Sequence, residues 1–222
     1  MYDFLSMILS PIVWAMWKVL EFFIHLTGSA GISVILLALF FTTILIPIQN
    51  YGRRIEERVR VKMKLVSDDL APYKGKLKGE EMFNQTEEIY KKHNYHPIHS
   101  VGLGMSFIVL LPILISAILL LGSHPLLEGQ NFLFVPDLSK PDGLLSPFNA
   151  LPIFMTGITL VEAFMRFKDD KPVLWRFIFI AAVLFVLVYN LAAALVIYWT
   201  TNVSVSLLMT LRERKKGRSN LA

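Results

Sequence analysis

The sequence predicts an all-α protein that crosses a membrane several times. Of its 222 residues, 55% are hydrophobic and only 18% are charged, and the mean hydropathy is +0.55. A soluble domain of this size could not cover so much apolar surface. The charges gather in one internal segment and at the C-terminal end, where an inside-positive topology would place them. We therefore predict a five-helix transmembrane bundle with an interfacial N-terminal helix and a cytoplasmic helical hairpin.

Residues 1–27 are predicted to form an amphipathic helix that lies at the membrane surface. The segment is rich in apolar residues, but Lys18 and Glu21 interrupt it and Trp14 and Trp17 lie beside them. Tryptophan prefers the membrane–water interface, and mid-segment charges suit an interfacial helix better than a spanning one. A spanning helix remains the alternative for this segment.

Residues 32–50 are predicted to form the first span. The stretch is apolar and close to the ~20 residues that cross the hydrocarbon core. Several arginines follow it, whereas one lysine precedes it, so we expect the N-terminus outside and the next segment in the cytoplasm. Pro47 should kink this helix near its cytoplasmic end.

Residues 51–97 are predicted to fold as a charged hairpin of two amphipathic helices in the cytoplasm. Apolar residues recur at helical spacing on either side of a break that contains Pro72, Gly75 and Gly79. Ion pairs four residues apart would support the two helices. They are Arg53 with Glu57, Glu56 with Arg60, Glu87 with Lys91, and Glu88 with Lys92.

The rest of the chain divides into four further spans and the segments that join them. Residues 122–147 are rich in turn formers and poor in lysine and arginine, which suits an external loop. The forty residues from 172 to 211 are about twice a span, so they need a turn, most simply near Tyr189 and Asn190. The spans are residues 101–121, 148–165, 172–188 and 191–211, and residues 212–222 form a basic cytoplasmic tail.

Six short stretches carry a family resemblance. They read, in chain order, LIPIQNYGRR, IYKKHNYHPIHS, LLPILISAILLL, FVPDLSKPDG, ALPIFMTGIT and YWTTN. In order and spacing they resemble the YidC/Oxa family of membrane protein insertases, in the short form without a large external domain. Each stretch is weak alone, but together they cover residues from about 20 to 216.

The resemblance implies a bundle that encloses a hydrophilic groove in the cell's inner (plasma) membrane. Such proteins accept hydrophilic tails of nascent membrane proteins and release the apolar spans into the lipid bilayer. A wet groove lowers the barrier because a polar segment in bare hydrocarbon leaves its peptide groups unsatisfied. The resemblance thus implies a non-enzymatic protein without a cofactor, which works with nascent chains, a ribosome or a translocon.

The sequence also departs from the family pattern. Thr42 stands where bacterial members carry a groove-facing arginine, and Leu110 stands where a glutamine is usual. Residues 191–194 read Leu-Ala-Ala-Ala in place of a Phe-Pro-Ala-Gly turn. We therefore expect a less charged groove, and an attraction of acidic tails by that arginine cannot be carried over.

Polar residues within the spans are the candidates for substrate binding, because each is costly there unless it meets water or a partner. The groove candidates are Thr42, Thr43, Gln49, Asn50, Ser106, Trp199, Thr200 and Asn202. The alternative is that threonine and serine hydroxyls bond carbonyls of their own helices. For Trp199 the alternative is interfacial anchoring or packing within the bundle.

Other polar residues predict no catalytic or metal site. Glu162 lies one helical turn from Arg166, which predicts a paired carboxylate rather than a proton relay. His93, His96 and His99 have no cysteine or nearby acid to complete a metal shell, and Pro97 separates them.

The basic tail has two candidate partners. Its cations could contact ribosomal RNA through phosphates, without recognising a nucleic-acid sequence, or they could contact anionic lipid. They are Arg212, Arg214, Lys215, Lys216 and Arg218. Two other functions remain open for the whole chain, namely a membrane-protein assembly scaffold without insertion activity and a small channel or transporter.

The predicted topology can be tested by single-cysteine labelling, since the chain contains no cysteine. A Ser139→Cys variant should react with an impermeant reagent from outside. A Ser67→Cys variant should react only after the membrane is permeabilised. The reverse pattern, or equal labelling, would contradict the five-span topology.

Overall fold

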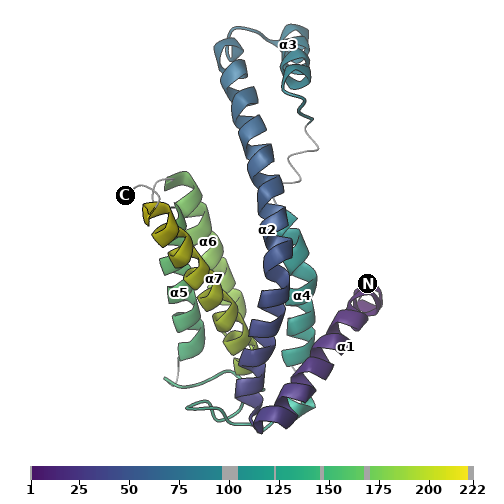
Figure 1. The fold of residues 1–222 in the computed structure, drawn as a ribbon, viewed down its shortest axis with the longest axis vertical. Coiled ribbons are helices and arrows are strands. Elements are labelled where there is room, and N and C mark those ends of the chain that lie inside the picture. Colours follow the sequence, from purple (N-terminus) through teal and green to yellow (C-terminus); the bar gives the residue numbers. More distant parts are fainter. Residues whose placement is uncertain (1, 97–104, 123, 146–147, 168–170, 220–222) are drawn as a thin grey trace. The chain divides into compact units, whose positions relative to one another are not determined.

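The computed structural model describes residues 2–96, 105–122, 124–145, 148–167 and 171–219, and these are mostly helical (Figure 1). In this part of the chain the β structure is limited to two isolated bridges, Phe132 with Val135 and Leu145 with Phe148. The α-helices are α1 (Tyr2–Thr27), α2 (Ala30–Leu70), α3 (Gly79–Lys92), α4 (Met105–Leu121), α5 (Ala150–Phe167), α6 (Lys171–Val188) and α7 (Ala193–Ser219). The predicted all-α membrane fold is confirmed.

Helix α2 contains both the predicted first span and the first arm of the predicted hairpin. The predicted boundary at residue 50 was wrong, because the helix continues unbroken to Leu70. The change from apolar to charged residues at this point does not end the helix, because Glu, Arg and Lys are good helix formers. It changes only the surroundings of the helix, from lipid to water. Pro47 also lies inside the helix, because one missing backbone donor can be tolerated within a long segment.

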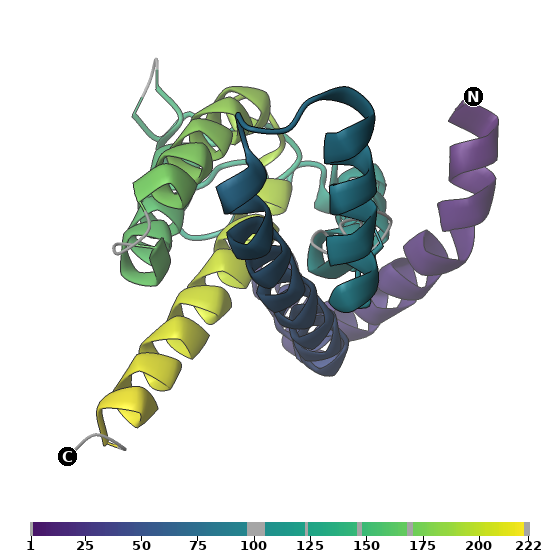
Figure 2. The same ribbon diagram turned by 90° about the horizontal axis from the view of Figure 1, so that it is seen from above.

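The chain divides into two compact units, and the smaller one comprises Ile44–Pro112. Here α3 packs against the last turns of α2, as Figure 2 shows from above. Val66, Leu70 and Ile89 are buried between the two helices. The predicted pair of amphipathic helices therefore exists, joined by a short 3₁₀ turn at Ala71–Tyr73.

Ion pairs in this hairpin follow the prediction only in part. Lys91 bonds Glu87 at 2.6 Å, as expected for residues four apart. The predicted pair of Glu88 with Lys92 was wrong, because the Lys92 ammonium lies 2.7 Å from Asp69 on α2. The partner on the other helix became visible only once the two helices were packed together.

The larger unit comprises Met1–Thr43 and Ile113–Ala222. Helix α5 packs against both α6 and α7, and Figure 1 shows these three helices side by side. The chain turns between α6 and α7 over residues 189–192, where the sequence predicted a turn. The main core of this unit joins α1, α2, α4 and α7 through buried side chains such as Leu20, Leu37, Leu121 and Leu195.

The segment between α4 and α5 caps the N-terminal ends of α5 and α7. The Asp142 carboxylate, which is buried, accepts hydrogen bonds from the backbone N–H groups of Ala150 at 2.8 Å and Leu151 at 3.1 Å. The carbonyls of Lys140 and Leu138 accept from Ala193 and Ala194 at the start of α7, at 2.8 and 3.0 Å. Donors that a helix leaves free in its first turn are thus satisfied by one segment.

Four helices of the described chain are long and apolar enough to cross a membrane. The candidate spans are Leu9–Thr27, Ala30–Tyr73, Ala150–Phe167 and Ala193–Arg212. Leu111–Leu121 and Leu174–Val188 are shorter apolar helices. The count of five spans and the interfacial position of the first helix therefore stay predictions.

Asp142 should be a large contributor to the stability of the bundle. An Asp142→Ala change leaves several backbone donors without their acceptor, so it should lower the free energy of unfolding by about 1–3 kcal/mol. Thermal unfolding in detergent measures this loss. Asp68→Ala, which alters an exposed carboxylate in the hairpin, is the control and should change little. Equal behaviour of the two variants would contradict the capping role.

Candidate functional site

A polar cluster joins α2 to α7 within their candidate spans. The Thr42 hydroxyl donates a hydrogen bond of 2.5 Å to the side-chain oxygen of Asn202. The Tyr198 side chain, one turn earlier on α7 and almost fully buried, lies near Asn202. Thr42 and Asn202 were nominated separately from the sequence, and the fold brings them together.

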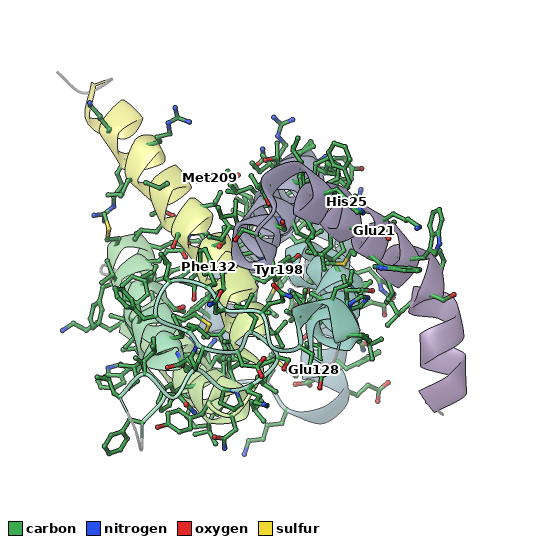
Figure 3. The ribbon with its side chains drawn as sticks, turned by 90° about the horizontal axis from the view of Figure 1, so that it is seen from below. Glu21, His25, Glu128, Phe132, Tyr198 and Met209 are labelled. Carbon is green, nitrogen blue, oxygen red and sulfur yellow. The ribbon has the colours of Figure 1, made fainter. Side chains whose placement is uncertain are left out.

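Tyr198 was not among the predicted groove residues. It lies inside the core that joins α1, α2, α4 and α7, and Figure 3 labels it near the middle of the bundle. Its position four residues before Asn202 puts both on one face of α7, which is the pattern that could have identified it. In the sequence, Tyr198 lies in an apolar segment and cannot be distinguished from an ordinary aromatic residue of the core.

The hydroxyls of two other candidates bond their own helices. Thr43 donates to the carbonyl of Leu39 at 2.7 Å, and Thr200 donates to that of Val196 at 2.7 Å. These are the internal bonds that the alternative interpretation expected. Neither bond prevents the same oxygen from accepting a second hydrogen bond, because a hydroxyl has two lone pairs.

Trp199 lies on α7 beside a second buried cluster. It is partly buried and packs with Met155 of α5, Val188 and Val196. Its ring therefore contributes to the contact between α5 and the end of the α6–α7 turn. Its role in a groove stays a proposal.

Three of the predicted groove residues belong to the smaller unit and are described by themselves. Asn50 is partly buried on α2. Gln49 lies in α2 and Ser106 in α4, but their side chains are outside the described part of the structure. The structure thus brings Thr42 and Asn202 into contact, and the groove role of the whole set stays a prediction.

The basic tail is helical, because α7 continues beyond its apolar part to Ser219. Arg212 and Lys215 are exposed and Arg214 is half-exposed. The side chains of Lys216 and Arg218 lie outside the described residues. A continuous helix therefore carries this basic segment directly from the last span.

Glu162 forms the second polar contact between helices. Its carboxylate lies 3.6 Å from the Arg166 guanidinium, which confirms the predicted pairing, and only 12% of its side chain is exposed. It also accepts hydrogen bonds from the hydroxyls of Ser206 at 2.6 Å and Thr210 at 3.4 Å on α7. These two residues were not among the predicted groove residues, although their spacing of four places them on one helical face.

The histidines do not gather around a metal site in the part of the chain that is described. His93 bonds the Asp69 carboxylate at 2.8 Å, and His99 lies outside the described residues. Within the described residues, no three His, Cys, Asp or Glu side chains lie together in a group that could hold a metal ion.

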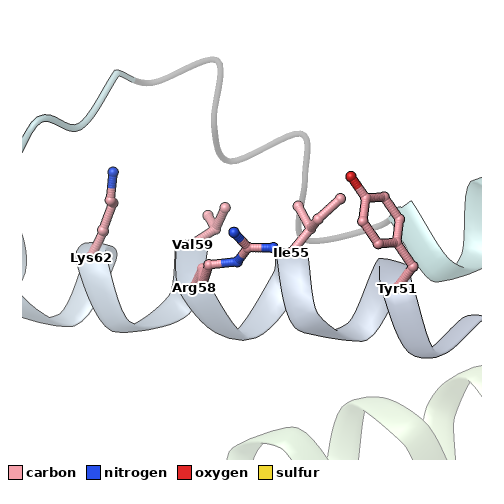
Figure 4. Close-up of a pocket in the computed structure, with 5 residues that line it drawn as sticks. All are labelled: Tyr51, Ile55, Arg58, Val59 and Lys62. Atoms are coloured by element: carbon pink, nitrogen blue, oxygen red, sulfur yellow. The ribbon is translucent and has the colours of Figure 1, made fainter.

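A hollow of about 280 Å³ lies along α2 in the smaller unit. Tyr51, Ile55, Arg58, Val59 and Lys62 line it, and Figure 4 shows these side chains rising from the same helix. The Lys62 ammonium donates to the carbonyl of Asn94, 3.0 Å away, beyond the end of α3. The surface combines apolar walls with two cations.

These features define a class: a multi-pass helical membrane protein with a hydrogen-bonded polar cluster between two of its candidate spans. The chain belongs to the 60Kd inner membrane protein family, whose sequence pattern matches residues 22–219. The resemblance to YidC/Oxa proteins that the sequence motifs indicated is thereby confirmed.

Curated relatives carry the name membrane protein insertase YidC. The protein of Polynucleobacter asymbioticus is 28% identical over 205 residues, which cover 90% of this chain and 34% of the relative. That of Chlamydia muridarum is 29% identical over 220 residues, which cover 90% of this chain and 27% of the relative. The chain thus spans about a third of the length of the relatives it matches.

A solved structure supports the fold. The crystal structure of an active YidC insertase with its first transmembrane domain resolved matches 92% of this chain and 46% of that chain. The TM-score is 0.54 at 18% sequence identity.

The contact between Thr42 and Asn202 should be measurable as a coupling energy. Thr42→Val removes the donor with little change of volume, and Asn202→Leu removes the acceptor. A double-mutant cycle on thermal unfolding in detergent should give a coupling of about 0.5–2 kcal/mol, the range of hydrogen bonds between membrane helices. Thr43→Val paired with Asn202→Leu is the control and should show additive effects. Additivity for Thr42 as well would contradict the contact.

Proposed function

We propose that this chain functions as a membrane protein insertase. Its family membership supports this function, and so do the names of its curated relatives. The structural observation that carries the proposal is the hydrogen bond between Thr42 of α2 and Asn202 of α7, with the buried Tyr198 beside it. Polar groups between two apolar helices are costly, and they are retained where they meet a polar ligand or water.

In this proposal the cluster is the part of the groove that first accepts a hydrophilic segment. The bond between Thr42 and Asn202 joins neutral groups, so a passing peptide can replace it with bonds of similar strength. Each peptide N–H or C=O then finds a partner before it reaches hydrocarbon, which lowers the barrier to crossing. Thr43, Gln49, Asn50, Ser106, Trp199 and Thr200 are the further groove residues that we propose.

The uncharged cluster sets the proposed substrate preference. Thr42 binds peptide groups over hydrogen-bond distances only, whereas an arginine at this place would attract acidic tails over a longer range. We therefore infer that insertion depends little on acidic residues in the translocated tail. The apolar spans of the substrate leave sideways into the lipid bilayer without covalent chemistry.

The proposed partners are nascent membrane proteins, and the family description supports an inner-membrane location. We propose an external N-terminus and a cytoplasmic C-terminus, because the basic segments would then lie inside. The exposed Arg212 and Lys215 on the last turns of α7 are suited to phosphates of ribosomal RNA or of anionic lipid. A ribosome and a translocon are therefore proposed partners.

One observation favours the alternative of an assembly scaffold. Thr42 is already bonded to Asn202, and this contact holds α2 and α7 together as a purely structural bond would. A scaffold would pack the spans of its clients without inserting them. Reconstitution with a simple substrate distinguishes the two functions.

The test uses proteoliposomes that contain this chain and a two-span substrate with either an acidic or a neutral tail. Wild type should insert both substrates above the level of empty vesicles and with similar yield. Thr42→Arg should stay folded and should raise the yield of the acidic-tailed substrate several-fold relative to the neutral one. No insertion above empty vesicles would contradict the insertase and favour the scaffold.

Two controls sharpen this experiment. Ser67→Arg adds the same charge at an exposed residue of the hairpin, outside the proposed groove, so it should not create a preference for acidic tails. Ion flux in the same vesicles tests a channel. A loss of thermal stability in Thr42→Arg alone would show that Thr42 packs in a dry contact, which contradicts the proposed groove.

A further inference from the structure

A tight turn between α4 and α5 displays two large apolar side chains. The backbone N–H groups of Phe132 and Val135 each donate to the other's carbonyl at 2.9 Å, so Leu133 and Phe134 form the turn between them. Leu133 is 81% exposed and Phe134 is 85% exposed. Among the large apolar residues that the structure describes, these two are the most exposed.

The backbone conformation of this turn is unfavourable at Leu133. Leu133 has a φ of +52°, in the left-handed region. Two-residue turns of this kind usually place glycine, asparagine or aspartate where φ is positive, because a larger side chain costs free energy there. The turn therefore carries an apolar residue despite both the backbone strain and the exposure to water.

The base of the turn is held firmly. Val135 is buried in the main core, and Phe132 packs against that core (Figure 3). A Cβ atom on Gly31 would lie 2.0 Å from Cγ of Phe132, so the ring lies directly on the backbone of α2 at this glycine. The two inner residues fix the turn, and the two outer residues project from it.

These contacts place the tip at the end of the apolar helices. Gly31 is the second residue of α2, and the carbonyls of Leu138 and Lys140 bond the first two residues of α7. Both α2 and α7 are candidate spans. The turn is therefore fastened where the chain enters the hydrocarbon core, which is the level of the membrane–water interface.

We propose that Leu133 and Phe134 form a lipid-binding tip that inserts into the interfacial layer of the bilayer. Contact with lipid explains the exposed apolar side chains on the helices of this protein. It equally explains the exposure of Leu133 and Phe134. Leucine and phenylalanine are residues that amphipathic segments bury at the boundary of headgroups and acyl chains. Leu145 and Phe148, which lie in the same connection before α5, are also exposed.

Lipid suits the tip better than a protein partner does. A stable protein interface buries roughly 800 Å² on each side, over some twenty residues. Two adjacent side chains provide only a small part of such an area, but each can enter lipid independently. The inference goes beyond the proposed insertase and does not depend on it.

The test places a single spin label on the tip, because the chain contains no cysteine of its own. Phe134→Cys is labelled and reconstituted in liposomes of phosphatidylethanolamine and phosphatidylglycerol. Glu128→Cys, exposed in the same connection, is the matched control. Collision rates with apolar O₂ and with a water-soluble nickel chelate are compared.

The label at Phe134 should collide at least several-fold more with O₂, relative to the chelate, than the label at Glu128. Equal, water-like accessibility at both positions would overturn the proposal. Protection of Phe134 from both reagents would also overturn it, since that result indicates a buried contact with a second copy. Leu133→Cys repeats the measurement, so that disturbance by one label cannot decide the outcome.

Discussion

The satisfaction of backbone donors at one end of the bundle is the constraint on which the larger unit depends. A helix in a membrane needs partners for the first N–H groups of its chain, because lipid supplies none. Asp142 provides them for α5, and the carbonyls of Leu138 and Lys140 provide them for α7. One connecting segment thus sets the positions of two helices. The buried alanines 192–194 let its backbone approach closely, since they add no bulky side chains.

The polar cluster follows from that arrangement. Once α7 lies against α2, Asn202 faces Thr42 and the two bond across the helices. Glu162 makes a similar contact further along α7, with Ser206 and Thr210. Both contacts put polar groups where an apolar helix pair would need none. Two such contacts hold α7 to different neighbours, so a change at either one should be felt along the whole helix.

In the hairpin, the sequence pattern predicts the apolar face of each helix but not which residues of that face are buried. The stripe of apolar residues in the second half of α2 correctly located the surface that packs on α3, where Val66, Leu70 and Ile89 are buried. Phe83, an apolar residue of α3, is exposed. Periodicity gives one face of a helix, but which residues of that face are covered depends on how far the partner helix extends.

The sequence by itself determined the helical membrane fold and the family, and it nominated Thr42 and Asn202 as separate candidates. Composition, charge distribution and hydrophobic periodicity are properties of single segments, and each segment reports them without its neighbours. Only the tertiary structure decided that α2 continues to Leu70, that Lys92 pairs with Asp69 and that Thr42 meets Asn202 with Tyr198 beside it. The residues of each of these contacts come from different helices. Their distance is fixed by helix packing and by the capping segment, and a one-dimensional pattern holds no measure of it.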